Sequence, residues 1–235
     1  MRRRARAGFS LIELMIAITL VAAISAGLLT AMRNGLLTMQ RTQQRLEDAR
    51  RAMGLQDLVR RQIGAAMPVR GMCSRDQGSF QVPIFRGNST ALLMISSEST
   101  TEGARGAPRI LFYRVQQNSD QTVRLEVLEL PFTGANSTAP YCDPVPTVIR
   151  QPSANVKPIV IYERLASCRF RYRNVSFDTL LSRDPWGDVW MFPYLPFAVR
   201  IEMKPAPGAD TRMPLTNITV PLHIVRSFEE TYADE

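Results

Sequence analysis

The chain has 235 residues, of which 45% are hydrophobic, so it can form one sizeable domain but not two large ones beside a long apolar segment. Its formal net charge of +8 falls to +4 without the four arginines among the first six residues. An excess of +4 is weak support for a nucleic-acid-binding protein, and we expect no nucleic acid as a partner.

The first long segment is apolar, and no residue from Leu14 to Met32 carries a formal charge. At about 1.5 Å per residue these residues make about 28 Å of helix, which is roughly the hydrocarbon thickness of a bilayer. The arginines that precede the segment favour a cytoplasmic N-terminus, with the rest of the chain on the far side of the membrane. Glu13 stands near the start of the segment, and an acid inside a membrane usually has a partner and a function.

A secretory signal peptide also has a basic start and an apolar core. Its cleavage site, however, follows the apolar region, whereas Gly8 precedes the apolar run here. A cut after Gly8 would leave the hydrophobic helix on the mature protein. The same cut would create an α-amino cation on Phe9, which can pair with the carboxylate of Glu13. The alternative is a signal anchor that is never cleaved.

The stretch from Gly8 to Leu14, GFSLIEL, resembles the processing motif of type IV prepilins and type II secretion pseudopilins. This resemblance implies that a prepilin peptidase in the membrane cuts after Gly8 and methylates the new amine of Phe9. It also implies that Glu13 pairs with the N-terminal amine of a neighbouring subunit in a helical filament.

Helical character continues after the apolar segment. No proline occurs between Met1 and Met67, and apolar residues recur at steps of three and four. This stripe consists of Leu46, Ala49, Ala52, Leu55, Val59, Ile63 and Ala66. It is rich in alanine and lacks a sustained leucine or isoleucine heptad, which favours packing on a sheet over a coiled coil. We predict one helix from Phe9 to about Met67, ended by Pro68.

From Val69 onward, prolines, glycines and hydroxyl residues separate short runs with β propensity. The predicted strands are 80–86, 91–96, 109–116, 123–130, 159–162, 166–175, 197–204 and 218–226. In the run 166–175, Cys168, Phe170 and Tyr172 alternate with three arginines. One face of this strand is therefore expected to be buried and the other to be an arginine ladder in water.

These elements predict an α+β fold with a long N-terminal helix packed on a mainly antiparallel, β-rich head, as in pilins. The predicted parts are a basic leader peptide at 1–8, the membrane-spanning half of the helix at 9–34, its amphipathic half at 35–67, and the head at 68–235. The expected location is the bacterial inner membrane, crossed once, with the N-terminus in the cytoplasm and the head in the periplasm.

Later segments narrow the resemblance. The run from Tyr162 to Tyr172 looks like the late strand of J-type minor pseudopilins (general secretion pathway protein J), as do Trp186 to Trp190 and Leu195 to Ile201. This resemblance implies a head with two sheets and a place at the filament tip, with I-type and K-type minor subunits and the major subunit as partners. The loops around Cys73 and Cys142 are outside that pattern, so a W-type minor pilin of a type IV pilus remains an alternative.

The sequence offers no catalytic constellation. Its only histidine, His223, lies in an apolar run, and one histidine with three scattered cysteines makes no zinc site. A glycine-rich phosphate loop and a nucleophile elbow are both missing. Asp184 and Asp188 beside Trp186 could bind a cation, but a turn closed by the neighbouring proline and glycine explains them more simply. We expect neither an enzyme nor a cofactor nor a metal site.

The three cysteines allow one disulfide and one free thiol in an oxidising compartment. Cys168 lies on the apolar face of a predicted strand and can be a small buried hydrophobe. Cys73 and Cys142 both fall in polar stretches, which makes them the preferred pair.

Two classes of function remain. One is a non-catalytic assembly component, a minor pseudopilin or a minor pilin at the tip of a filament. The other is a membrane-anchored binding protein that uses a basic head to hold DNA or a surface ligand. Glu13 favours the first class, because a mere anchor needs no acid in the membrane.

Overall fold

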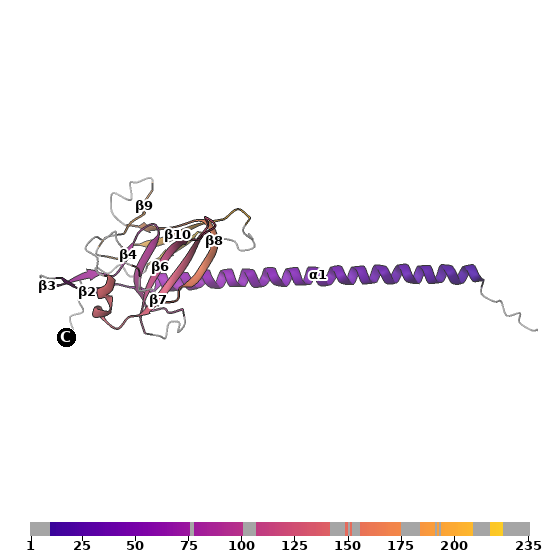
Figure 1. Ribbon diagram of the computed structural model, residues 1–235, viewed down its shortest axis with the longest axis horizontal. Helices are drawn as coiled ribbons and strands as arrows, with labels where there is room; N and C mark the ends of the chain where they lie inside the picture. The colour runs from indigo at the N-terminus through magenta and orange to yellow at the C-terminus, as the bar shows by residue number, and fades with distance from the viewer. Residues whose placement is uncertain are drawn as a thin grey trace, which may run out of the picture. The chain divides into compact units, whose positions relative to one another are not determined.

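A computed structural model describes residues 10–75, 78–100, 107–141, 149, 151, 156–174, 184–190, 192, 194–208 and 217–222. These residues fall into two compact units, one up to Arg50 and one from Arg51 on. The main elements are one long helix and a set of antiparallel strands (Figure 1). The two units are described separately.

The first unit consists of the N-terminal part of α1, the helix Leu11–Gly64. Its apolar segment is long and apolar enough to cross a membrane, and none of it is buried within the chain. The hydroxyls of Thr19 and Thr30 donate to the backbone carbonyls of Ile16 and Ala26, at 2.9 and 2.8 Å. Because these two hydroxyls are satisfied inside the helix, they need no partner from the surroundings, which is what lipid requires.

The second unit is built on a nine-stranded antiparallel sheet with the order β1-β5-β6-β7-β8-β10-β11, in which β4 pairs with β5 and β9 with β8 (Figure 1). Its strands are β1 Ala66–Met67, β4 Arg86–Gly87, β5 Ala91–Ser96, β6 Arg109–Gln117, β7 Val123–Pro131, β8 Ile159–Arg173, β9 Trp186–Gly187, β10 Ala198–Pro205 and β11 Ile218–Pro221. A second sheet pairs β2, Arg70–Arg75, with β3, Gly78–Pro83. The short 3₁₀ helix η1, Ala135–Tyr141, packs on β2. The predicted α+β fold is confirmed.

Most of the predicted strands form, and the differences have local causes. The run 91–96 is β5, and β6 and β7 match their predicted runs within one residue at each end. The runs 159–162 and 166–175 are one strand, β8, because a bulge at Arg164, with φ of 53°, keeps the polar residues between them in the sheet. The run 80–86 divides between β3 and β4, which belong to different sheets. For 218–226, β11 covers the first four residues, and the part after 222 lies outside the described residues.

The helix ends at Gly64, which corrects the predicted end at Met67. Ala66 and Met67 instead form β1 and pair with Ser96 and Ile95 of β5. A helix could not continue through Pro68 in any case, so pairing with the sheet edge satisfies backbone groups that the last turn would leave open. Sequence periodicity could not show this, because Ala66 is buried in either conformation.

Both faces of the large sheet are covered. On one face Val59 and Ile63 of α1, with Ala66 of β1, pack against alternate residues of the central strands, including Leu92 and Leu111. On the other face the intervening residues of the sheet pack against the second sheet and η1. They include Leu93, Ile95, Ile110 and Phe112, and η1 contributes Tyr141. The predicted packing of the helical stripe on a sheet is confirmed from Ala52 onward, whereas Leu46 is 54% exposed.

A buried polar network, which the sequence pattern did not predict, joins α1 to the sheet through Gln62. Its side-chain nitrogen donates to the Thr100 hydroxyl at 2.9 Å, and its side-chain oxygen accepts from the Tyr113 hydroxyl. The Ser96 hydroxyl donates to the backbone carbonyl of Gln62 at 2.8 Å. Burial, with a smaller contribution from the charge of Glu129, raises the pKa of Tyr113, so its hydroxyl stays a neutral donor.

The arginine ladder on β8 is only partly in water. Cys168, Phe170 and Tyr172 are buried, as the alternation predicted. The Arg171 side chain, however, is only 14% exposed and pairs with Asp184 at 2.8 Å and with Asp188 at 3.3 Å. The predicted turn between these two acids is wrong in its centre, where Trp186 and Gly187 form β9 and pair with β8. The two acids form ion pairs with Arg171 of the neighbouring strand β8.

We predict that Tyr113→Phe destabilises the head by about 1–3 kcal/mol, because it leaves the buried oxygen of Gln62 without its donor. Urea unfolding of a soluble version that starts at residue 35 measures the effect. The half-buried Tyr194 bonds to Asn174 at 3.3 Å, and Tyr194→Phe should change the free energy of unfolding by less than about 0.5 kcal/mol. Equal effects of the two variants would contradict the role given to the Gln62 network.

Candidate functional site

The candidate site begins where α1 begins. Ser10 caps the helix, because its backbone carbonyl accepts from the amides of Glu13 and Leu14 at 3.1 and 3.2 Å. The Ser10 side-chain oxygen accepts from the Glu13 amide at 3.3 Å. Serine followed by glutamate three residues later is the sequence pattern of a capping box. This pattern is the sequence signal that places the start of the helix at Ser10.

The cap fixes the position of Glu13 in the first turn of the helix. A carboxylate is favoured there, because the unpaired amides of the first turn carry partial positive charge. Glu13 is exposed, and within the described part of the chain it forms no ion pair. The predicted cleavage site after Gly8 and the predicted methylation site at Phe9 both lie outside the described residues.

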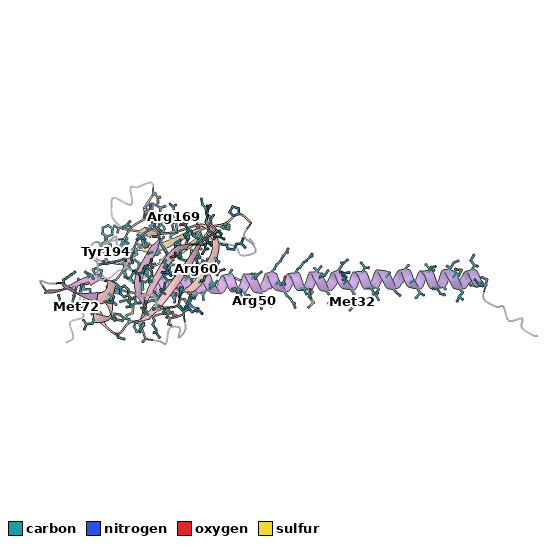
Figure 2. All side chains as sticks on the ribbon, in the orientation of Figure 1. Met32, Arg50, Arg60, Met72, Arg169 and Tyr194 are labelled. Atoms are coloured by element: carbon teal, nitrogen blue, oxygen red, sulfur yellow. The ribbon has the colours of Figure 1, made fainter. Side chains whose placement is uncertain are left out.

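The apolar surface that follows Glu13 surrounds the helix. Leucine, isoleucine, valine and methionine side chains are exposed along its length to Met39. Figure 2 shows side chains standing out on all sides of α1 around Met32. Such a surface cannot stay in contact with water, so a membrane, other helices or both must cover it.

The cysteines of the head have unequal environments. Cys73 lies in β2, opposite Phe80 of β3, which corrects its prediction as a loop residue. It is buried and is not a free thiol. Cys168 is a free cysteine on the buried face of β8, as predicted, and burial raises the pKa of its thiol to about 12. At neutral pH it is therefore an inert, neutral group.

Cys142 lies outside the described residues, but the residue before it is placed. Tyr141 is the last residue of η1 and is buried in the core on the face of the large sheet that η1 and the second sheet cover. Earlier in η1, the Thr138 hydroxyl lies so close to β2 that a Cβ on Gly71 would be 2.1 Å from it. The described end of η1 therefore lies next to the strand that contains Cys73.

Other chemistry has little support in the described residues. Among them, no three His, Cys, Asp or Glu side chains converge in a way that could hold a metal ion. His223 lies outside them. Glu126 is fully buried, but Arg114 and Arg124 both donate to it, so its charge is balanced within the sheet.

Comparison with known proteins adds one finding about the N-terminus. Residues 3–29 match the family described as "Prokaryotic N-terminal methylation motif". No curated protein matches the chain. The match covers three of the four N-terminal arginines, Glu13 and most of the apolar segment, and it shows the methylation motif of the type IV prepilin and pseudopilin superfamily, which prepilin peptidase processes. The apolar helix that follows is consistent with anchoring in the inner membrane.

Proposed function

We propose that this prepilin-like chain is a J-type minor pseudopilin, a non-catalytic component at the tip of a type II secretion pseudopilus. The observation that carries the proposal is the methylation motif joined to a capped, wholly exposed apolar helix with Glu13 in its first turn. Its partners are the I-type and K-type minor subunits, the major subunit and the prepilin peptidase.

Cleavage after Gly8 makes this arrangement functional. It removes the basic leader and leaves Phe9 as the N-terminus, one residue before the Ser10 cap. The new amine and the Glu13 carboxylate are opposite charges where water is scarce, and an unpaired acid there costs on the order of 3 kcal/mol. Pairing with a neighbouring subunit removes this cost only at the correct stagger between helices. Glu13 thereby selects the register of assembly.

The binding-protein alternative loses support from the ion pairs of the head. Arg169 pairs with Glu202 at 2.6 Å, and Arg171 is enclosed by acidic partners. A groove for nucleic acid needs arginines whose charge is available to phosphates. One observation supports the alternative of a W-type minor pilin. The β2-β3 hairpin, whose Cys73 is not a free thiol, lies in a region outside the J-type resemblance.

The head also carries a proposed disulfide between Cys73 and Cys142. Cys73 is not a free thiol, Cys168 is, and η1 brings the chain to β2 just before residue 142. Such a bond would tie the two-stranded sheet to η1. Two strands alone are marginally stable, so the hairpin would gain most from it.

The first prediction concerns processing. Intact-mass analysis of protein from a host with a prepilin peptidase should give a chain that starts at methylated Phe9. Gly8→Val should block the cut, because it places a branched Cβ beside the scissile bond. The matched control is Gly27→Val, where a side chain meets nothing within 4 Å, and it should be processed normally. A chain that starts at Met1, or after Ala23 or Ala26, would contradict the prepilin assignment.

The second prediction concerns the cysteines. Non-reducing peptide mapping of the periplasmic form should link Cys73 to Cys142. Cys168 should react with an alkylating reagent only after unfolding, because it is buried and its thiol stays protonated. A bridge that includes Cys168 would show that the pairing is wrong.

The third prediction tests the charge pair. Glu13→Ala should leave the head folded but lower cross-linking of the full-length protein to its filament partners by about tenfold or more, since 1.4 kcal/mol is a factor of ten. Glu47→Ala removes an exposed acid from the same helix beyond the apolar segment and is the control. If cross-linking and secretion are unchanged in the Glu13→Ala strain, the pairing role is wrong and an anchor role gains support.

A further inference from the structure

The head contains an open pocket of about 250 Å³ at one end of the large sheet. It lies where the end of β8, β9 and the segment after β9 meet. Its apolar lining comes mainly from Trp186, Val189, Trp190 and Phe192. None of these residues belongs to the N-terminal motif at residues 3–29, which carries the proposed assembly function.

The floor of the pocket is fixed before any ligand arrives. Trp190 is buried, its ring nitrogen donates to the Tyr194 carbonyl at 2.8 Å, and its backbone forms a bridge with Gly87. The Tyr172 hydroxyl donates to the Asn88 carbonyl at 3.0 Å. A Cβ on Gly87 would lie 2.1 Å from this hydroxyl, so the close approach of Tyr172 to β4 depends on glycine. The pocket is thus preorganised.

Apolar groups at the rim stay in contact with solvent. Phe192 is 43% exposed and Val189 is 38% exposed. The Phe192 ring contacts Trp190 edge-on at 4.9 Å between centroids and stacks on Tyr194 at 5.3 Å. Figure 2 marks Tyr194 in this part of the head. Rigid aromatic side chains with an exposed edge are typical of the centre of a binding surface.

The size and lining of the pocket restrict what it can hold. Pockets for cofactors and drug-sized molecules usually measure about 300–1,000 Å³, and this one is smaller. The lining is predominantly apolar, which suits an aliphatic or aromatic group better than a polar one. A pocket of this size fits one large side chain of another protein.

Charge at the rim restricts the ligand further. The side chains of Asp184 and Asp188 are each 56% exposed, whereas their partner Arg171 is 14% exposed. The guanidinium of Arg200 lies over the Trp186 ring at 3.9 Å. Arg200 is 32% exposed and pairs with Glu202, so the most exposed charged groups beside the pocket are the two carboxylates, which favour a cation next to the apolar anchor.

We propose that this pocket binds one large apolar side chain, aromatic or leucine-sized, from a partner protein segment that carries a basic residue next to it. The partner's apolar group would lie against Trp190 and Phe192, and its cation would meet Asp184 and Asp188.

The chain itself supplies a specific probe, because its only two tryptophans, Trp186 and Trp190, both line the pocket. The full-length protein, labelled with 5-fluorotryptophan in phospholipid nanodiscs, is titrated with N-acetyl-Phe-Arg-amide and followed by ¹⁹F NMR. Both resonances should shift in a saturable way. N-acetyl-Phe-Glu-amide should bind at least about threefold more weakly, and N-acetyl-Ser-Arg-amide should give no saturable shift.

Two exposed phenylalanines give a matched pair of variants. Phe192→Ser should weaken binding of N-acetyl-Phe-Arg-amide about tenfold, whereas Phe197→Ser, at a residue 42% exposed outside the pocket, should leave it unchanged. Circular dichroism melting checks that both variants fold. If Phe192→Ser does not fold, Val189→Ser, which removes apolar surface at the rim without adding charge, should also weaken binding.

Three results would overturn the proposal. The first is equal binding of the Phe and Ser peptides, which would mean that charge alone attracts them. The second is tighter binding of N,N′-diacetylchitobiose than of the Phe-Arg peptide, which would indicate a carbohydrate site. The third is a shift of the resonances with protein concentration alone, which would make a second copy of this chain the occupant.

Discussion

The structure depends on one constraint, which is that the apolar surface of α1 from Leu14 to Met32 cannot remain in water. Within the described residues the chain does not bury that segment, and the hydroxyls of Thr19 and Thr30 are satisfied by the helix backbone. The surroundings must therefore supply the cover. Glu13 is the charged residue that directly precedes this segment, and the Ser10 cap fixes its place in the first turn of the helix. In a membrane, a carboxylate without a partner would be costly there.

The apolar side chains of α1 have two different environments along the helix. From Ala52 its stripe is buried against the large sheet, and Gln62 adds a polar connection whose members lie on α1, β5 and β6. Buried polar groups of this kind cost free energy when any partner is lost, so they specify one arrangement of helix end and sheet rather than merely adding contact area. The end of α1 and the centre of the head are accordingly one cooperative structure.

Within the head, charged side chains are paired with opposite charges close by. Glu126 pairs with two arginines, and Arg171 pairs with the two aspartates that flank β9 and with Glu202 of β10. This balance reduces the basic character that the composition suggests. The pocket near β9 keeps an aromatic, apolar lining, and the most exposed charges beside it are carboxylates.

The sequence by itself determined the apolar span, the prepilin motif, the long helix and the alternation of β8, because each follows from the order of neighbouring residues. It could not determine that Ala66 and Met67 leave the helix for β1, that Gln62 is buried, or that Asp184 and Asp188 serve Arg171. Those outcomes depend on partners 13 to 51 residues away, and local periodicity carries no information about them. The tertiary structure decided them, since buried backbone and side-chain polar groups must find partners wherever the fold places them.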